Sequence, residues 1–276
     1  GYPAHTLHEI IPDFHNTPAR FAQLQEAVKN DKAGRVKDVA PELGFANTWE
    51  EACGLLTGLL GKGELPLRVT HNDTKMSNVL LDGQGKAVCV IDLDTVMPGL
   101  CAFDFGDSIR AGAATAAEDE TDLSKVRFDL ERYRAYARGF LATAGGALTE
   151  KERETLPDGA ILMTLEVGLR FLADYLNGDV YFRTAYPQHN LDRARNQFKL
   201  VQEMEASRAA MAASPFRTTA AISSARWTVR SVLPAATILA AKRASRVASP
   251  SSRGAKSAAS SRSRLGSRSA ARQTFR

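Results

Sequence analysis

The sequence contains no acidic residue after Glu205, although it has 276 residues and 31 aspartates and glutamates. Residues 1–205 carry 22 basic side chains and a net charge of −9, whereas residues 206–276 carry 14 basic side chains and a net charge of +14. The overall charge of +5 therefore comes from the C-terminal part. It does not indicate what the acidic part binds.

Cysteines and long apolar runs are also scarce. The three cysteines, Cys53, Cys89 and Cys101, are odd in number and show no C-x-x-C spacing, which excludes a disulfide framework. We expect a reduced cytoplasmic protein in which Cys89 is a core residue of a strand. The apolar run at 232–241 has ten residues and includes Pro234, so it is too short to span a membrane.

The C-terminal part has almost no residues that could form a core. Residues 207–276 are rich in Ser, Ala and Arg, and only Trp227 and two phenylalanines supply aromatic rings. Such a composition predicts a disordered basic tail, separate from a folded domain over residues 1–206. The tail could bind nucleic acid or an anionic membrane, and a frame-shifted C-terminus would have the same composition.

The most informative stretch is residues 69–94, VTHNDTKMSNVLLDGQGKAVCVIDLD. It predicts a β-hairpin with one strand over 79–82, a turn over 83–86 and a buried return strand over 87–91. A hairpin brings together the residues that flank its open end. We therefore expect Asn78 and Asp92 to lie side by side.

The residues around this open end suit phosphoryl transfer. Asp73 could orient the attacking hydroxyl and accept its proton, while Lys75 offsets phosphate charge. Asn78 and Asp92 offer the hard oxygen ligands that Mg²⁺ prefers. Asp94 would share a side with Asp92 if both lie on a strand, so it could contact the metal or the substrate.

Several segments resemble the aminoglycoside phosphotransferase and choline kinase superfamily. They are HNDTKMSNVLLD, VIDLDTVMPG and FDFGDSIR, together with HTLHEIIPDFHNTPARF, EVGLRFLADYLNGDVYF and HNLDRARNQFKLVQEME. The residues in these segments are most similar to those of the N-acetylhexosamine 1-kinases. The resemblance covers about residues 4–206.

The resemblance implies an α/β (α+β) fold that corresponds to a protein-kinase-like C-terminal lobe, mainly helical around the catalytic-loop hairpin. Family members also have an N-terminal lobe with a phosphate-covering loop and a strand lysine. No such loop precedes Asp73. The glycines at 58, 61 and 63 follow a leucine-rich stretch and are typical of a helix end. We expect the N-lobe to be missing and this chain alone to phosphorylate poorly.

The implied function is the ATP- and Mg²⁺-dependent phosphorylation of the anomeric hydroxyl of an N-acetylhexosamine. The resemblance places Arg170 and Tyr181 in the sugar pocket. A simpler interpretation of Arg170 is an i,i+4 ion pair with Glu166 on a solvated face. Alternative functions are a choline- or aminoglycoside-type phosphotransferase, and an inactive fragment whose basic tail binds nucleic acid.

Helical spacing predicts the remaining elements. Helices are expected over 18–30 with Thr17 as N-cap, 49–60, 105–112, 126–141, 160–176 and 190–205, with a capping box at Thr149–Glu152. Asp104 begins a D-F-G sequence, but it lies twelve residues beyond Asp92. We therefore expect Asp104 or Asp107 to accept N–H groups at the start of the 105–112 helix. The resemblance implies that a downstream aspartate of this kind braces the catalytic loop. His15 is expected to support a turn.

Overall fold

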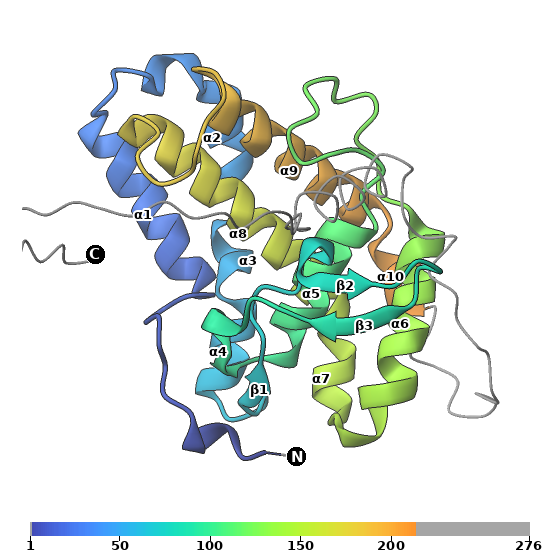
Figure 1. The fold of residues 1–276 in the computed structure, drawn as a ribbon. Coiled ribbons are helices and arrows are strands. Elements are labelled where there is room, and N and C mark those ends of the chain that lie inside the picture. Colours follow the sequence, from blue (N-terminus) through green and yellow to red (C-terminus); the bar gives the residue numbers. More distant parts are fainter. Residues whose placement is uncertain (1, 214–276) are drawn as a thin grey trace, which may run out of the picture. The chain divides into compact units, whose positions relative to one another are not determined.

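The computed structural model describes residues 2–213, and Figure 1 shows their arrangement. The helices are α1 (Thr17–Asn30), α2 (Ala40–Asn47), α3 (Glu50–Cys53), α4 (Leu55–Gly61), α5 (Cys101–Gly112), α6 (Leu130–Ala144), α7 (Glu150–Glu154), α8 (Leu156–Asn177), α9 (His189–Ala206) and α10 (Arg208–Ala213). The strands are β1 (Arg68–Thr70), β2 (Val79–Leu81), β3 (Ala87–Val90) and β4 (Met97–Gly99). Strand β1 pairs antiparallel with β4, and β2 pairs antiparallel with β3. The fold is therefore α+β and rich in helix, as predicted.

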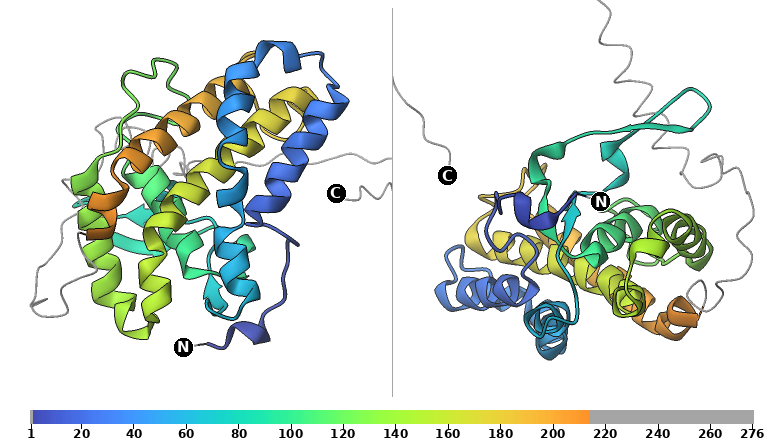
Figure 2. Two further views of the ribbon diagram at one scale, coloured as in Figure 1. Left: turned by 180° about the vertical axis from the view of Figure 1, so that it is seen from behind. Right: turned by 90° about the horizontal axis from the view of Figure 1, so that it is seen from below.

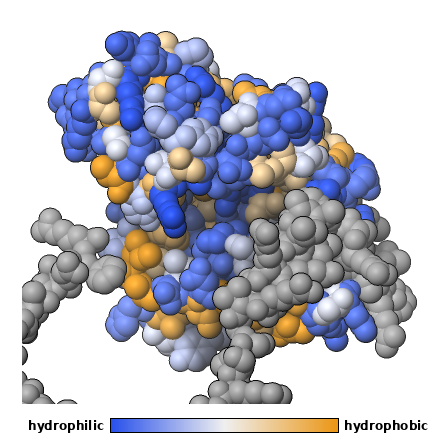
Figure 3. All heavy atoms as spheres, turned by 45° about the horizontal axis from the view of Figure 1, so that its top comes forward, coloured by the Kyte–Doolittle hydropathy of each residue, from blue (hydrophilic) through white to orange (hydrophobic). Residues whose placement is uncertain are grey.

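Helix α8 forms the centre of the hydrophobic core. It packs against α1, α5 and α9, and 17 of its 22 residues are buried. The sequence predicted this helix over 160–176 from its nearly uniform apolar character, and a helix that is apolar all round must be covered on all sides. Polar residues dominate the outer face shown in Figure 3, where apolar residues form only small separate groups.

Two glycines let α5 cross close to α8. A Cβ atom on Gly106 would lie 2.3 Å from the carbonyl oxygen of Gly159, and a Cβ atom on Gly159 would lie 2.5 Å from the carbonyl oxygen of Ala102. Any larger side chain at either glycine would separate the two backbones. This crossing fixes the position of α5, which carries Asp104.

The hairpin of β2 and β3 forms as predicted, but it is not buried. Val79 pairs with Val90 and Leu80 with Cys89, and Gly85 takes a left-handed φ of 80° in the turn. Every residue of β3 is exposed, with Val88 at 61%. The expectation that Cys89 is a core residue is therefore wrong. In the right-hand view of Figure 2 the hairpin projects from the helices, which fits the exposure of β3.

Helix starts were predicted less accurately than the helices themselves. Asn16, and not Thr17, caps α1 by accepting the N–H of Ala19 at 3.1 Å. Asp129 caps α6, so that helix starts later than the predicted position 126. Helix α5 starts earlier than predicted, at Cys101.

The segment predicted as one helix over 49–60 is divided into α3 and α4 at Gly54. Glycine has a low helix propensity, which fits a break at this position. Helix α2 was not predicted. The capping box at Thr149 and Glu152 is present as predicted, and the Glu152 carboxylate also pairs with Arg68 of β1 at 2.7 Å.

The helical part of the chain extends past the predicted boundary at residue 206. Helix α10 packs against α6, α8 and α9, and the side chain of Met211 is buried. Arg208 forms ion pairs with Asp158 and Glu205. The rest of the predicted tail, residues 214–276, lies outside the described residues. Within residues 2–213, no helix combines the length and apolar character needed to cross a membrane.

Candidate active site

The loop that carries Asp73 is held by a carboxylate from helix α5. The two oxygens of Asp104 accept the backbone N–H groups of His71 and Asn72 at 2.9 and 2.7 Å. Burial raises the pKa of Asp104, and these two N–H donors oppose that effect. Asp104 thus braces this loop, as the resemblance implied. Neither Asp104 nor Asp107 caps α5, which corrects the expectation that one of them accepts N–H groups at the start of that helix.

Asn72 shapes the same loop, and the sequence analysis did not identify it. Its backbone takes a left-handed φ of 64°, a conformation that asparagine tolerates better than most residues. Its buried side chain donates to the carbonyl of Thr95 at 3.0 Å and accepts the Thr70 hydroxyl at 3.0 Å. Gly99 lies so close that a Cβ atom there would be 2.7 Å from Asn72 Oδ1. The turn before Asp73 is therefore tightly defined.

Asp73, Lys75 and Asn78 converge as predicted. Oδ2 of Asp73 lies 2.5 Å from Lys75 Nζ and accepts a hydrogen bond from Asn78 Nδ2 at 3.0 Å. No hydrogen bond to Oδ1 of Asp73 occurs within residues 2–213, and the side chain is 24% exposed. This oxygen is available to accept a hydrogen bond from a substrate hydroxyl.

His71 connects this loop to the end of the hairpin. Its Nε2 lies 3.0 Å from the carbonyl oxygen of Ile91, and its Nδ1 faces the backbone N–H of Asp73 at 3.3 Å. An N–H on Nε2 and a lone pair on Nδ1 satisfy both contacts. The imidazole therefore links Asp73 to the residue that precedes Asp92.

Asn78 and Asp92 flank the open end of the hairpin. The backbone N–H of Ile91 donates to the carbonyl of Asn78 at 2.9 Å, which places Asp92 next to that pair. Asp92 has a left-handed φ of 64°, and residues Leu93–Thr95 form a 3₁₀ turn. Asp92 and Asp94 are thus not on a strand, which corrects the expectation that they share one strand face.

The donor set at this position fits Mg²⁺. The carboxylates of Asp92 and Asp94 are exposed and make no hydrogen bond or ion pair within residues 2–213, and Asn78 uses its amide nitrogen on Asp73 while its amide oxygen accepts no hydrogen bond there. The described residues include no cluster of three or more His, Cys, Asp and Glu side chains that could hold a metal alone. Mg²⁺ is commonly bound by one or two carboxylates together with phosphates and water.

His15 makes a buried contact with the loop that carries Asp73. It was expected only to support a turn. Its Nε2 lies 2.8 Å from the carbonyl oxygen of Asn72, and its Nδ1 lies 2.9 Å from Oε1 of Glu166. Glu166 is fully buried, and its other oxygen accepts the hydroxyl of Thr17 at 2.8 Å. The interpretation of Glu166 and Arg170 as an i,i+4 ion pair is therefore wrong.

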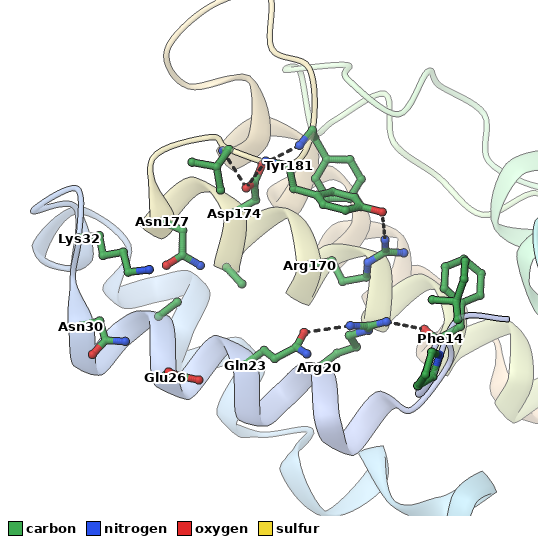
Figure 4. Close-up of a pocket in the computed structure, with 16 residues that line it drawn as sticks. Phe14, Arg20, Gln23, Glu26, Asn30, Lys32, Arg170, Asp174, Asn177 and Tyr181 are labelled. Atoms are coloured by element: carbon green, nitrogen blue, oxygen red, sulfur yellow. Dashed lines mark hydrogen bonds between the residues drawn. The ribbon is translucent and has the colours of Figure 1, made fainter. Parts of the chain in front are cut away.

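Arg170 and Tyr181 line a cavity of about 480 Å³ between α1, α8 and the loop after α8. Figure 4 shows both side chains on the same side of this cavity, opposite Arg20 and Gln23 of α1. Arg170 Nη2 lies 3.5 Å from the Tyr181 hydroxyl, and its guanidinium lies near the rings of Phe14, Tyr181 and Phe182. The sequence analysis placed both residues in a pocket, and the structure brings them together at one.

Asp174 holds the loop that carries Tyr181, and the sequence analysis did not identify it. Its Oδ1 accepts the backbone N–H groups of Val180 and Tyr181, and its Oδ2 accepts that of Phe182 and the amide of Asn190. A carboxylate that accepts four hydrogen bonds has no free lone pair for a ligand. Asp174 therefore supports the cavity wall.

Residues 5–140 match the model of the phosphotransferase enzyme family, APH. The match supports the resemblance to the aminoglycoside phosphotransferase and choline kinase superfamily, and it supports a phosphotransferase. The family generally uses ATP and Mg²⁺ with a small-molecule acceptor.

The matched residues include the loop with Asp73 and the open end of the hairpin with Asp92. They do not include Arg170 and Tyr181. The match does include Phe14 and Arg20, which line the cavity from the side of α1.

Proposed function

We propose that the protein is an ATP-dependent kinase that phosphorylates the anomeric hydroxyl of an N-acetylhexosamine. Asp73 orients this hydroxyl through its free Oδ1 and accepts its proton. Lys75, which pairs with Asp73 in this structure, contacts the γ-phosphate in the nucleotide complex. The observation that carries the proposal is the partner-free Oδ1 of Asp73 on a loop that hydrogen bonds link to the hairpin end, where Asp92 has an unpaired carboxylate.

On the nucleotide side, Asn78 and Asp92 hold Mg²⁺ through their oxygens. When bound, the ion neutralises charge on the nucleotide phosphates. Asp94 is exposed next to Asp92, and we assign it to the sugar. The nucleotide also needs a strand lobe with a phosphate-covering loop and a lysine, because catalysis of phosphoryl transfer is largely positioning and electrostatics.

On the acceptor side, Arg170 and Tyr181 offer donors to the hydroxyl and acetamido oxygens of a sugar. A choline- or aminoglycoside-type acceptor is cationic and needs acidic or aromatic walls. Here the aromatic rings of Phe14 and Phe182 already lie near Arg170, and the cavity wall also carries Arg20. These positive charges favour a sugar over a cation. The three cysteines are free, which fits a cytoplasmic reaction.

Removal of Arg170 tests the acceptor. The assay uses a joined enzyme, in which residues 1–276 follow the strand lobe of an active family member. Arg170→Ala should lower kcat/KM for N-acetylglucosamine by about 10- to 100-fold, because a lost charged hydrogen bond costs roughly 1.5–3 kcal/mol. The affinity for ATP should stay unchanged. The wild-type product should carry its phosphate on the anomeric oxygen, as seen by phosphorus NMR.

Arg183→Ala is the matched control, since Arg183 is exposed and lies outside the cavity lining. It should leave kcat/KM for the sugar within about twofold, as is usual for a surface substitution. A product phosphorylated at position 6, or faster turnover of choline or an aminoglycoside, would move the assignment to the alternative acceptors.

Removal of Asp92 tests the metal site. Asp92→Asn in the joined enzyme should raise the Mg²⁺ concentration for half-maximal rate by roughly tenfold or more, because the carboxylate is the only charged ligand proposed there besides the nucleotide. Asp104→Asn should leave this concentration unchanged and lower thermal stability instead, because it removes an acceptor from a buried N–H group. A Mg²⁺ requirement that responds to Asp104→Asn and not to Asp92→Asn would contradict the assignment.

A further inference from the structure

Two guanidinium groups line the cavity, one from each of the helices that enclose it. Arg20 comes from α1 and Arg170 from α8, and Figure 4 shows them facing each other across the cavity. Neither of them forms an ion pair with a carboxylate within residues 2–213. Both side chains are half-buried, and a cation that loses part of its hydration is normally paired with an acid, so two unpaired ones at a single cavity need an explanation.

The way Arg170 is held leaves its N–H groups available. Its guanidinium carbon lies 5.8, 5.6 and 5.4 Å from the ring centres of Phe14, Tyr181 and Phe182. Contacts with aromatic faces stabilise the positive charge without using N–H donors. Its one hydrogen bond among the described residues is the long contact of 3.5 Å with the Tyr181 hydroxyl. The position of this group is fixed, and most of its donors remain free.

Arg20 makes hydrogen bonds, but only to uncharged acceptors. It donates to the side-chain oxygen of Gln23 at 3.0 Å and to the carbonyl oxygens of Asp13 and Phe14 at 3.1 and 2.9 Å. Its Nε is buried without a partner. Burial and the nearby charge of Arg170 lower the pKa of Arg20, and the charges of Glu166 and Asp13 offset this effect only in part. Neutral acceptors therefore hold Arg20 in place, and no carboxylate within residues 2–213 forms an ion pair with it.

The nearby carboxylates bind other groups, and within residues 2–213 none of them forms an ion pair with Arg20 or Arg170. Asp174 uses both oxygens on backbone N–H groups and on Asn190, and Glu166 uses both on His15 and Thr17. The carboxylate of Asp13 accepts a hydrogen bond from Asn16. Two exposed side chains of opposite charge also line the cavity, Glu26 of α1 and Lys32 of the segment after α1. An anionic ligand would complete this arrangement.

We propose that Arg20 and Arg170 form an oxyanion subsite that holds a carboxylate or phosphoryl group on the acceptor sugar. The proposal rests on the proposed function and narrows its acceptor, from N-acetylhexosamines in general to those that carry an anionic group. A planar guanidinium can bind two oxygens of such a group at once, and two guanidiniums can share a single anion. The cavity of about 480 Å³ has the size of typical ligand sites, which allows a substituted sugar.

The first experiment compares three sugars by calorimetry with the full chain. The probes are N-acetylglucosamine, its 6-carboxylate analogue (2-acetamido-2-deoxyglucuronate) and N-acetylglucosamine 6-phosphate. At least one anionic sugar should bind about tenfold more tightly than the neutral sugar, the gain expected of one charged hydrogen-bonded contact. The relative affinities of the carboxylate and the phosphate identify the group. Equal or weaker binding of both anionic sugars would overturn the proposal.

Matched variants assign this preference to the two arginines. Arg20→Gln and Arg170→Gln should each reduce it to about twofold or less, whereas Arg183→Gln, which removes the same charge outside the cavity, should keep it. Arg170→Lys keeps the charge but loses the planar fork, so it should retain only part of the preference. Thermal melting of each variant confirms that it is folded. A preference that survives both Gln variants would overturn the proposal.

A second experiment separates the subsite from the proposed enzymatic function. Inorganic phosphate is titrated into ¹⁵N-labelled protein, and the Nε–H signals of Arg20 and Arg170 are assigned with the two Gln variants. Saturable shifts of both signals would support the subsite. If in addition no sugar binds, that result would count against the sugar-kinase assignment and would leave the subsite supported. Unchanged signals would overturn the subsite even if N-acetylglucosamine is phosphorylated.

Discussion

Replacement of Asp73 by asparagine should lower kcat of the joined enzyme by about two to four orders of magnitude, with little change in ATP affinity. Asparagine has nearly the same shape, so Asn78 and the loop backbone can keep their positions. It lacks the negative charge that attracts the hydroxyl proton and pairs with Lys75 at 2.5 Å. The measurement is steady-state kinetics together with nucleotide titration.

Asp38→Asn is the matched control for this substitution. Asp38 is exposed in a 3₁₀ turn after α1, away from the loop with Asp73, so the change should leave kcat within about twofold. If Asp73→Asn weakened ATP binding as strongly as it slowed turnover, Asp73 would be acting on the nucleotide and not on the acceptor hydroxyl.

The sequence was sufficient to predict the parts of the site that depend on local signals. The turn glycines define the hairpin, and its pairing brings Asn78 and Asp92 to the same end. The position of Asp73 and Lys75 near Asn78 then follows, because they are only five and three residues before it in the chain. The long apolar stretch of α8 placed Arg170 inside the helical core, where a charge needs a ligand or partner.

The sequence did not indicate contacts between distant residues. Glu166 has a suitable partner four residues away in Arg170, but its carboxylate binds His15, which is 151 residues away in the chain. No local rule distinguishes these alternatives, because the choice depends on how α1 and α8 pack. The exposure of β3 was not predicted for a similar reason. Apolar residues in a strand show that its faces can be buried, but not whether a distant element packs against them.

The loop that carries Asp73 is supported from two directions by buried groups. Asp104 of α5 accepts N–H groups of the loop, and His15, just before α1, contacts a carbonyl of the same loop. Asp104 contacts His71 and Asn72, and His15 contacts Asn72, directly before the proposed catalytic residue. Rigid placement of such a residue is a large part of phosphoryl-transfer catalysis. The packing of α1 and α5 against α8 is thereby linked to the position of Asp73.

The ionic character of His15 leads to a prediction about stability and pH. Both ring nitrogens of His15 face oxygen atoms, of Glu166 and of the Asn72 backbone, so a protonated ring satisfies both contacts. Burial lowers the pKa of His15, but the hydrogen bond and charge of Glu166, the Asn72 carbonyl and the charge of Asp107 outweigh it, and the pKa is raised. The unfolded chain has a histidine pKa of about 6.5.

Since the folded-state pKa of His15 is the higher one, the stability that its proton contributes is fully present below about pH 6.5 and is lost as the pH rises through the folded-state value. Urea unfolding of the full chain between pH 5.5 and 9 should show this loss.

Glu166→Gln should reduce the free energy of unfolding at pH 6 by about 3–5 kcal/mol, the cost of leaving a buried charge unpaired, and should flatten the pH dependence. His15→Gln should also flatten it, while His8→Gln, at an exposed position, should leave the wild-type profile unchanged. A wild-type profile that persists in Glu166→Gln would show that the pair is not ionic.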